Sequence, residues 1–181
     1  GSVRLPRGTY HAVSSEWFYE NARTHGMLVV EPEISVTEDR QVVLDVAAAR
    51  PITARVDRAA RLHSADFAVY VAGGGIGMTY TPRAADDPEP YLYASPVRVR
   101  AAENFEFRIH HAFKEPAGGA SPVTYSVLSR VLGEIPERLH FRYRDRDLAR
   151  VDTRYVAQGT PTLGRSANCP AYPGDWISFC L

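Results

Sequence analysis

The stretch FEFRIHHAF, residues 105–113, decides the fold class of this chain of 181 residues. Its apolar residues and one histidine occupy every second position, and polar residues stand between them. The first set is Phe105, Phe107, Ile109, His111 and Phe113, and the second is Glu106, Arg108 and His110. Successive side chains of a β-strand point to opposite faces, so the first set is expected in a core and the second in water. His111 is therefore expected to be a buried, hydrogen-bonded structural histidine rather than a metal ligand.

The same period of two recurs along the chain. Further alternating segments fall at residues 42–46, 52–56, 67–71, 97–99 and 139–143. Turn-forming residues, such as Gly73-Gly74-Gly75 and Gly118-Gly119, separate the segments at intervals typical of a sandwich. The sequence therefore predicts an all-β fold: an antiparallel β-sandwich of the immunoglobulin or prealbumin type, with about ten strands and little helix.

Two segments are open to a second interpretation. Residues 14–26 (SSEWFYENARTHG) have some helical spacing, but the pattern favours a strand end, a loop and a new strand that begins at Met27. Residues 125–136 (YSVLSRVLGEIP) suit either a short helix or a strand. The strand pattern stops at the charged cluster of residues 144–147, so we expect a sandwich domain over residues 3–144. Residues 145–181 then form a C-terminal segment that packs on this domain or begins a second β module.

The charge balance excludes two classes of partner. The chain has 21 Lys and Arg residues against 21 Asp and Glu residues, without the basic stripe that nucleic-acid binding requires. No apolar run approaches the roughly 20 residues that cross a bilayer. We therefore expect neither a nucleic-acid partner nor a membrane partner.

The two cysteines, Cys169 and Cys180, lie in the segment NCPAYPGDWISFC near the end of the sequence. Their spacing fits neither a redox Cys-x-x-Cys motif nor a zinc site. Pro173 and Gly174 turn the chain between them, which favours a Cys169–Cys180 disulfide over two free thiols. A disulfide implies an oxidising compartment, so the expected location is secreted or extracellular.

No catalytic signature is present in the sequence. The serines do not stand in Gly-x-Ser-x-Gly, and the glycine-rich residues 73–77 precede no Lys-Ser/Thr, so neither a nucleophile elbow nor a phosphate loop is expected. We expect no catalytic, cofactor-binding or metal-binding residues. An aromatic set is the remaining candidate for ligand binding, because ring faces stack on sugars, although aromatics also fill β cores. The set is Trp17, Phe18, Tyr19, Tyr80, Tyr91 and Tyr93.

Three segments carry a resemblance to a known family: LPRGTYH (residues 5–11), MLVVEPEISVTEDRQVVLDVAAARPITARV (27–56) and RYRDRDLARVDTRYVAQG (142–159). Their order resembles the region downstream of the catalytic domain in large secreted subtilisin-like serine peptidases of actinobacteria. The matching positions are Leu44, Asp45, Ala49, Pro51 and Ile52. The resemblance covers about residues 3–160 and extends to prealbumin-like and carboxypeptidase-regulatory-like sandwiches. The peptidase motifs Asp-Thr/Ser-Gly, His-Gly-Thr and Gly-Thr-Ser-Met-Ala are absent, so no catalytic residue carries over.

The resemblance implies a non-catalytic accessory domain of a secreted peptidase. Such a domain would stabilise or position the protease or present protein substrate, and its partner would be the peptidase domain of its parent chain or that substrate. The alternative is an extracellular module that binds polysaccharide or matrix through exposed aromatics. A third hypothesis is a stand-alone hydrolase, for which the sequence offers no nucleophile or acid–base pair. An exposed row of aromatics would favour a binding module, and a scattered, buried set would favour a structural role.

Overall fold

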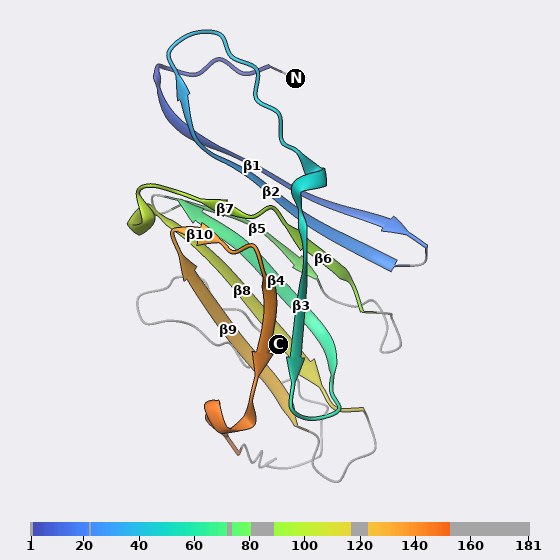
Figure 1. Cartoon of the computed structure of the whole chain (residues 1–181). Coiled ribbons are helices and arrows are strands. Elements are labelled where there is room, and N and C mark those ends of the chain that lie inside the picture. The colour runs from blue at the N-terminus through green and yellow to red at the C-terminus, as the bar shows by residue number, and fades with distance from the viewer. Residues whose placement is uncertain (1, 22, 72–73, 81–88, 117–122, 153–181) are drawn as a thin grey trace, which may run out of the picture.

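The computed structural model describes residues 2–21, 23–71, 74–80, 89–116 and 123–152. Over these residues the elements are strands and three short 3-10 turns, so the all-β prediction is confirmed (Figure 1). The turns are η1 (Val46–Ala48), η2 (Ala102–Asn104) and η3 (Asp145–Asp147). No helix in this part of the chain is long and apolar enough to span a bilayer.

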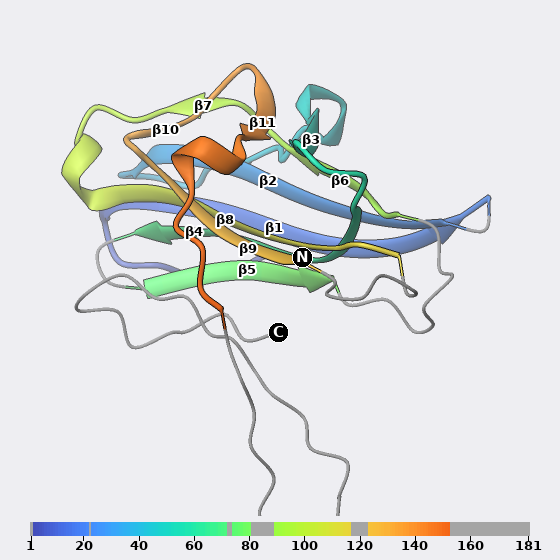
Figure 2. The same ribbon diagram turned by 90° about the horizontal axis from the view of Figure 1, so that it is seen from below.

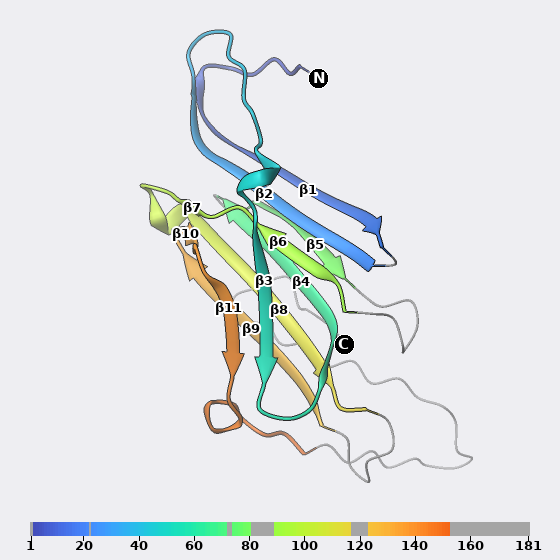
Figure 3. The same ribbon diagram turned by 45° about the vertical axis from the view of Figure 1, so that its right-hand side comes forward.

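The strands form two main sheets and one short ribbon. The five-stranded sheet has the order β1 (Gly8–Glu20), β2 (Arg23–Val36), β6 (Tyr91–Ala94), β3 (Arg50–Val56) and β11 (Leu139–Tyr143). The four-stranded sheet has the order β5 (Gly74–Tyr80), β4 (Arg61–Val71), β8 (Phe105–Lys114) and β9 (Thr124–Leu132). The ribbon pairs β7 (Val97–Arg98) with β10 (Glu134–Ile135). Pairing is antiparallel except for β2 with β6 and β3 with β11, which lie side by side in Figure 3.

The two sheets pack face to face, and the core lies between them (Figure 2). The predicted sandwich is therefore confirmed, and its assignment to the immunoglobulin or prealbumin type stays a prediction. Among the largest fully buried side chains are Leu28, Phe67, Phe105, Phe107, Ile109 and Leu139. Both sheets contribute to this set, as expected for strands that bury alternate residues. Gly133, between β9 and β10, has φ +75, and a Cβ there would come 2.5 Å from the Cβ of Ala102, so the chain needs glycine at this corner.

Strand β8 confirms half of its predicted face pattern and contradicts the other half. Phe105, Phe107, Ile109, His111 and Phe113 are all at most 2% exposed, as expected. The prediction that Glu106, Arg108 and His110 face water is wrong, because they are 8%, 8% and 0% exposed. β8 is a central strand with β4 on one side and β9 on the other. Polar side chains of these neighbours hydrogen-bond to its outer face, so the strand is buried on both faces.

The two ambiguous segments are strands. Residues 14–26 lie in the β1–β2 hairpin, as favoured, although the second strand begins at Arg23 instead of Met27. Residues 125–132 are in β9, and residues 134–135 form β10. The helical interpretation of both segments is therefore excluded.

The strand predicted at residues 42–46 is wrong. Val42 and Val43 have no strand assignment and are 39% and 68% exposed, and η1 begins at Val46. The Oδ1 atom of Asp45 accepts a hydrogen bond of 2.9 Å from the backbone N–H of Ala47, which caps this turn. Local side-chain bonding of this kind competes with extended structure. β2, the strand that precedes this segment, pairs with β1 along most of its length and with β6 over residues 25–28, and residues 42–46 pair with neither of its edges.

The start of the C-terminal segment contacts the sandwich. Asp145 donates its backbone N–H to Oδ2 of Asp57 at 3.0 Å, and its carboxylate accepts from the hydroxyl of Tyr125 at 2.6 Å. Residues 153–181 lie outside the described residues, and Cys169 and Cys180 are among them. The Cys169–Cys180 disulfide and the division at residue 145 therefore stay predictions.

Candidate functional site

Aromatic rings gather on the outer face of the five-stranded sheet. Phe18 of β1 stands opposite His25 of β2, and His25 stands beside Tyr91 of β6. Phe18 stacks on His25 with a centroid distance of 4.7 Å and an interplanar angle of 16°. His25 lies 5.1 Å from Tyr91 and 6.2 Å from Tyr93. We call Phe18, His25, Tyr91 and Tyr93 the aromatic row.

Other side chains of the domain cover some of the ring faces in the aromatic row. The guanidinium carbon of Arg23 lies 4.9 Å from the centroid of the Tyr91 ring, which is cation–π geometry. Arg23 also donates to the backbone carbonyl of Glu89 at 3.4 Å. Phe18 and Tyr91 remain 41% and 44% exposed. The row is thus ordered by contacts within the domain and still accessible to a partner.

The structure divides the aromatics proposed from the sequence. Tyr91 and Tyr93 lie in the row, but Trp17 and Tyr19 are on the opposite face of β1 from Phe18. Trp17 packs edge-on to Phe67 at 6.3 Å and lies over Gly26, where a Cβ would come 2.4 Å from its ring. Tyr19 is 71% exposed near the end of β1. Tyr80 ends β5, and its side chain lies outside what the structure describes.

Sequence reasoning missed His25, the ring that joins the row. It contacts Phe18 and Tyr91 only because the β1–β2 and β2–β6 registers place these residues side by side. The sequence offers no signal for the second register, since Tyr91 of β6 lies 66 residues after its partner His25 and the two strands pair in parallel. The alternation around residue 18 could have separated Phe18 from Trp17 and Tyr19.

The other half of this outer face is polar and basic. Thr53 Oγ1 lies 2.6 Å from Nδ1 of His140, across β3 and β11. The next pair on the same face is Arg55 beside Arg142. Arg142 reaches Asp57 at 3.7 Å, and both members of this pair are exposed. We call Arg55 and Arg142 the arginine pair. Like charges directly beside each other in a sheet repel.

The outer face of the four-stranded sheet holds an ion cluster around Glu106. Arg130 donates to both carboxylate oxygens of Glu106, at 2.5 and 2.6 Å, and Arg108 donates to the same group. The Arg108 guanidinium also covers the Tyr70 ring at 4.2 Å. Burial by itself would raise the pKa of Glu106, but hydrogen bonds from Arg130 and Arg108 outweigh it and lower the pKa. The carboxylate therefore stays ionised between two guanidinium groups.

A Ser–His–Asp chain lies on the same face. His110 Nδ1 is 3.1 Å from Oδ2 of Asp66, and His110 Nε2 is 2.9 Å from Oγ of Ser126. The atom order matches that of a serine hydrolase triad, and no sequence motif could reveal it, because the three residues come from β4, β8 and β9. A catalytic histidine must also hand a proton to the leaving group. His110 is 0% exposed, so we interpret Ser126, His110 and Asp66 as a hydrogen-bond relay that joins three strands.

His111 fills the inner face of β8, as expected. It is 1% exposed, and its Nδ1 lies 2.8 Å from the hydroxyl of Tyr143, which also contacts Ser129 Oγ at 3.1 Å. Burial, with a smaller contribution from the charge of His110, lowers the pKa of His111 to about 3. The prediction of a buried, hydrogen-bonded structural histidine is confirmed.

Within the described part of the chain, no group of three or more His, Cys, Asp or Glu residues has the arrangement of a metal site. No family model, curated protein or solved structure matches this chain. The resemblance to the accessory region of subtilisin-like peptidases therefore stays a prediction.

Proposed function

We propose that this chain is a non-catalytic accessory module that binds protein, and that the aromatic row is its contact surface. One observation carries the proposal: four rings meet on the outer face of the five-stranded sheet, with Phe18 and Tyr91 41% and 44% exposed. Exposed apolar side chains that cluster mark interaction sites more often than single ones. Contacts within the row hold its rings in place, so little side-chain entropy is lost on binding.

The ring geometry favours protein over polysaccharide as the partner. A sugar needs an open ring face on which to stack, but Phe18 stacks on His25 and Arg23 covers one face of Tyr91. Met27 stands beside Tyr93 on the same face, in the β2–β6 register. Tyr, Phe, Met and Arg are the residue types enriched at the cores of protein interfaces, and Tyr and Arg are frequent among hot spots.

The charges elsewhere on the same face of the sheet indicate the chemistry of the partner. Arg55 and Arg142 stand side by side across β3 and β11, where like charges repel, and Asp57, at 3.7 Å from Arg142, offsets part of this repulsion. A carboxylate placed between them would turn that repulsion into attraction and would add orientation to the contact. We therefore expect a protein surface that presents an apolar side chain to the aromatic row and an acidic residue to the arginine pair.

The resemblance found in the sequence supplies a specific partner. In the accessory arrangement the module would bind the peptidase domain of its parent chain, outside the cell, and would position or stabilise it. The polysaccharide-binding module remains the alternative, and both hypotheses use the same surface.

Isothermal titration of this domain against the separately produced peptidase domain of the parent chain tests the proposal. Phe18→Ala with Tyr91→Ala should weaken binding by about tenfold or more, as expected for interface anchors. Tyr19→Ala is the matched control, because Tyr19 is equally aromatic and 71% exposed but lies outside the row, and it should leave the affinity unchanged.

Three results would contradict the proposal. A parent gene without a peptidase domain would remove the accessory role. Retention on insoluble cellulose, chitin or xylan that Phe18→Ala with Tyr91→Ala abolishes would identify a carbohydrate module. Equal losses from the row variants and from Tyr19→Ala would show that the aromatic row is not the contact surface.

A further inference from the structure

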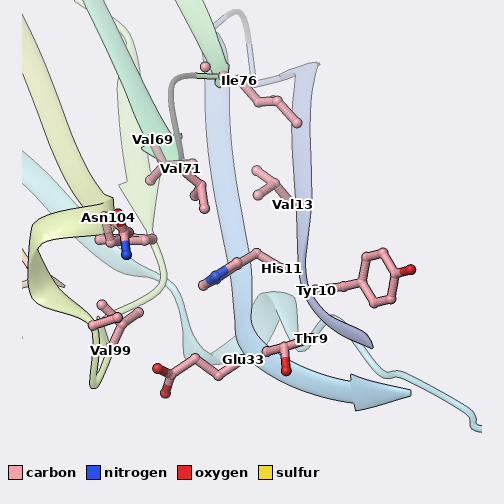
Figure 4. A pocket seen from close by; sticks show the side chains of 14 residues that line it. Thr9, Tyr10, His11, Val13, Glu33, Val69, Val71, Ile76, Val99 and Asn104 are labelled. Carbon is pink, nitrogen blue, oxygen red and sulfur yellow. The ribbon is translucent and has the colours of Figure 1, made fainter. Parts of the chain in front are cut away.

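A cleft of about 620 Å³ opens between the edges of the two sheets. It lies where β1 and β2 of one sheet face β4 and β5 of the other, and η2 borders one end (Figure 4). Most of its wall is apolar, formed by Val13, Val69, Val71, Ile76, Val99 and Phe105. The size and the lining are those of sites for small ligands, which combine apolar walls with a few placed polar groups.

His11 supplies the first polar group. Its imidazole extends into the cleft from β1, 6.3 Å from the ring of Phe105 by centroid (Figure 4). Its Nδ1 is buried and has no hydrogen-bond partner among the residues that the structure describes. Buried polar atoms are almost always hydrogen-bonded, and leaving one unpaired costs free energy. A ligand group in the cleft would provide the missing bond.

Glu33 supplies the second polar group, through an unusual backbone. It has φ +51 inside β2, the left-handed region that residues other than glycine rarely adopt. Its side chain extends beside His11 toward the region of Val99 (Figure 4). Oε1 accepts the backbone N–H of Arg100 at 2.9 Å, and no hydrogen bond to Oε2 is found among the described residues. One carboxylate oxygen is thus available at the polar end of the cleft.

We propose that this cleft binds a small molecule with an apolar body and a hydrogen-bond-donating head, an amine or an alcohol. The Val-rich wall would bury the body, and the head would donate to Glu33 Oε2 and contact Nδ1 of His11. A carboxylate head would meet the Glu33 carboxylate at close range, in a site where repulsion is strong. The cleft is therefore expected to discriminate between heads of opposite charge on the same alkyl chain.

The test uses the whole chain and the dye N-phenylnaphthylamine, an apolar molecule with one N–H donor whose fluorescence rises in apolar sites. The dye should bind, and decylamine and decanol should displace it at concentrations about tenfold lower than decanoate does. Glu33→Gln keeps an oxygen acceptor for Arg100 and removes the charge. This variant should bring the displacing concentration of decanoate close to that of decanol.

Blocking the cleft provides the location control. Ile76 is 49% exposed and lines the cleft, so Ile76→Trp should narrow it without loss of fold and should abolish dye binding. Leu132→Trp is the matched control, since Leu132 is 59% exposed, lies in β9 and does not line the cleft. Absence of dye binding by the unmodified chain would overturn the proposal. Dye binding that survives Ile76→Trp, or a head-group preference that Glu33→Gln leaves unchanged, would overturn it equally.

Discussion

The outer faces of the two sheets differ in which side chains they bury and which they expose. The four-stranded sheet buries charged and polar residues, Glu106, Arg108 and His110, and pairs them with one another and with neighbouring strands. The five-stranded sheet leaves Phe18 and Tyr91 of the aromatic row 41% and 44% exposed. Polar side chains are thus buried on the outer face of one sheet, and apolar side chains are exposed on the outer face of the other. The type of a side chain alone therefore does not decide its exposure, because hydrogen bonding can make burial of charge tolerable.

The two outer faces also differ in whether a binding partner is needed to explain them. A buried polar cluster whose members hydrogen-bond to one another stabilises the fold and needs no ligand to complete its hydrogen bonds. A cluster of exposed rings is instead the kind of surface at which a partner could bind. The proposed contact surface therefore lies on the five-stranded sheet, although the more elaborate hydrogen-bond networks lie on the other.

Truncating a phenylalanine should destabilise the four-stranded sheet far more than the aromatic row of the five-stranded sheet. Phe107 is 0% exposed in β8, so Phe107→Ala should lower the free energy of unfolding by about 3–5 kcal/mol, as for other buried Phe truncations. Phe18→Ala, in the aromatic row, should cost about 1 kcal/mol, since the ring is already half in water. Urea unfolding of both variants measures the difference. Equal costs would mean that the aromatic row is part of the core.

Removing the charge of Glu106 should have the next largest effect. Glu106→Gln leaves Arg108 and Arg130 without their shared carboxylate, and breaking a buried ion pair by changing one partner costs about 3 kcal/mol. Because the pKa of Glu106 is lowered in the folded state, its contribution is present above the ordinary glutamate range and is lost as pH falls. Urea midpoints at neutral and acidic pH measure both. Glu134→Gln is the control, because its partner Arg98 is exposed at the surface.

Prediction from sequence succeeded where local alternation decides the structure. Residues 105–113 showed a strand, and the inner set of that strand was correct because apolar groups seek the core. The outer set was wrong because its burial depends on Asp66, Ser126 and Arg130, which come from other strands. Alternation at Val42 was misleading, because a strand also needs a partner edge, and pairing is not visible in a single segment.

The candidate site was predictable only in part, for the same reason. Tyr91 and Tyr93 were candidates for ligand binding, and they lie together on one surface. Their neighbours Phe18 and His25 are set by register, and two of the expected aromatics, Trp17 and Tyr19, lie on the other face of β1. The cleft at His11 depends on how the edges of two sheets approach each other, which no spacing along the chain encodes.

A pH dependence should distinguish His111 from the exposed residues. Its pKa of about 3 lies below the ordinary value of 6.5, so the folded state holds it neutral while the unfolded chain takes up a proton. Stability is therefore full above pH 6.5 and falls as pH decreases toward about 3. Between pH 6.5 and about 5 the loss from this group should be roughly 2 kcal/mol.

His111→Gln provides the comparison, because glutamine keeps a hydrogen-bond acceptor for Tyr143 and does not titrate. The free energy of unfolding of this variant should change less over the same pH interval, by the amount assigned to His111. Identical pH profiles would show that the buried ring is not the source of the acid sensitivity.

The smallest effect decides between a relay and a triad at Ser126. If Ser126, His110 and Asp66 join three strands structurally, Ser126→Ala removes one hydrogen bond and lowers the free energy of unfolding by about 1 kcal/mol. The hydroxyl should also be inert to a fluorophosphonate, because His110 is 0% exposed and cannot pass a proton to a leaving group. Urea unfolding and mass spectrometry of the treated chain measure the two outcomes. Labelling of Ser126 that His110→Gln abolishes while the domain stays folded would contradict the structural relay. It would make the outer face of the four-stranded sheet a catalytic surface.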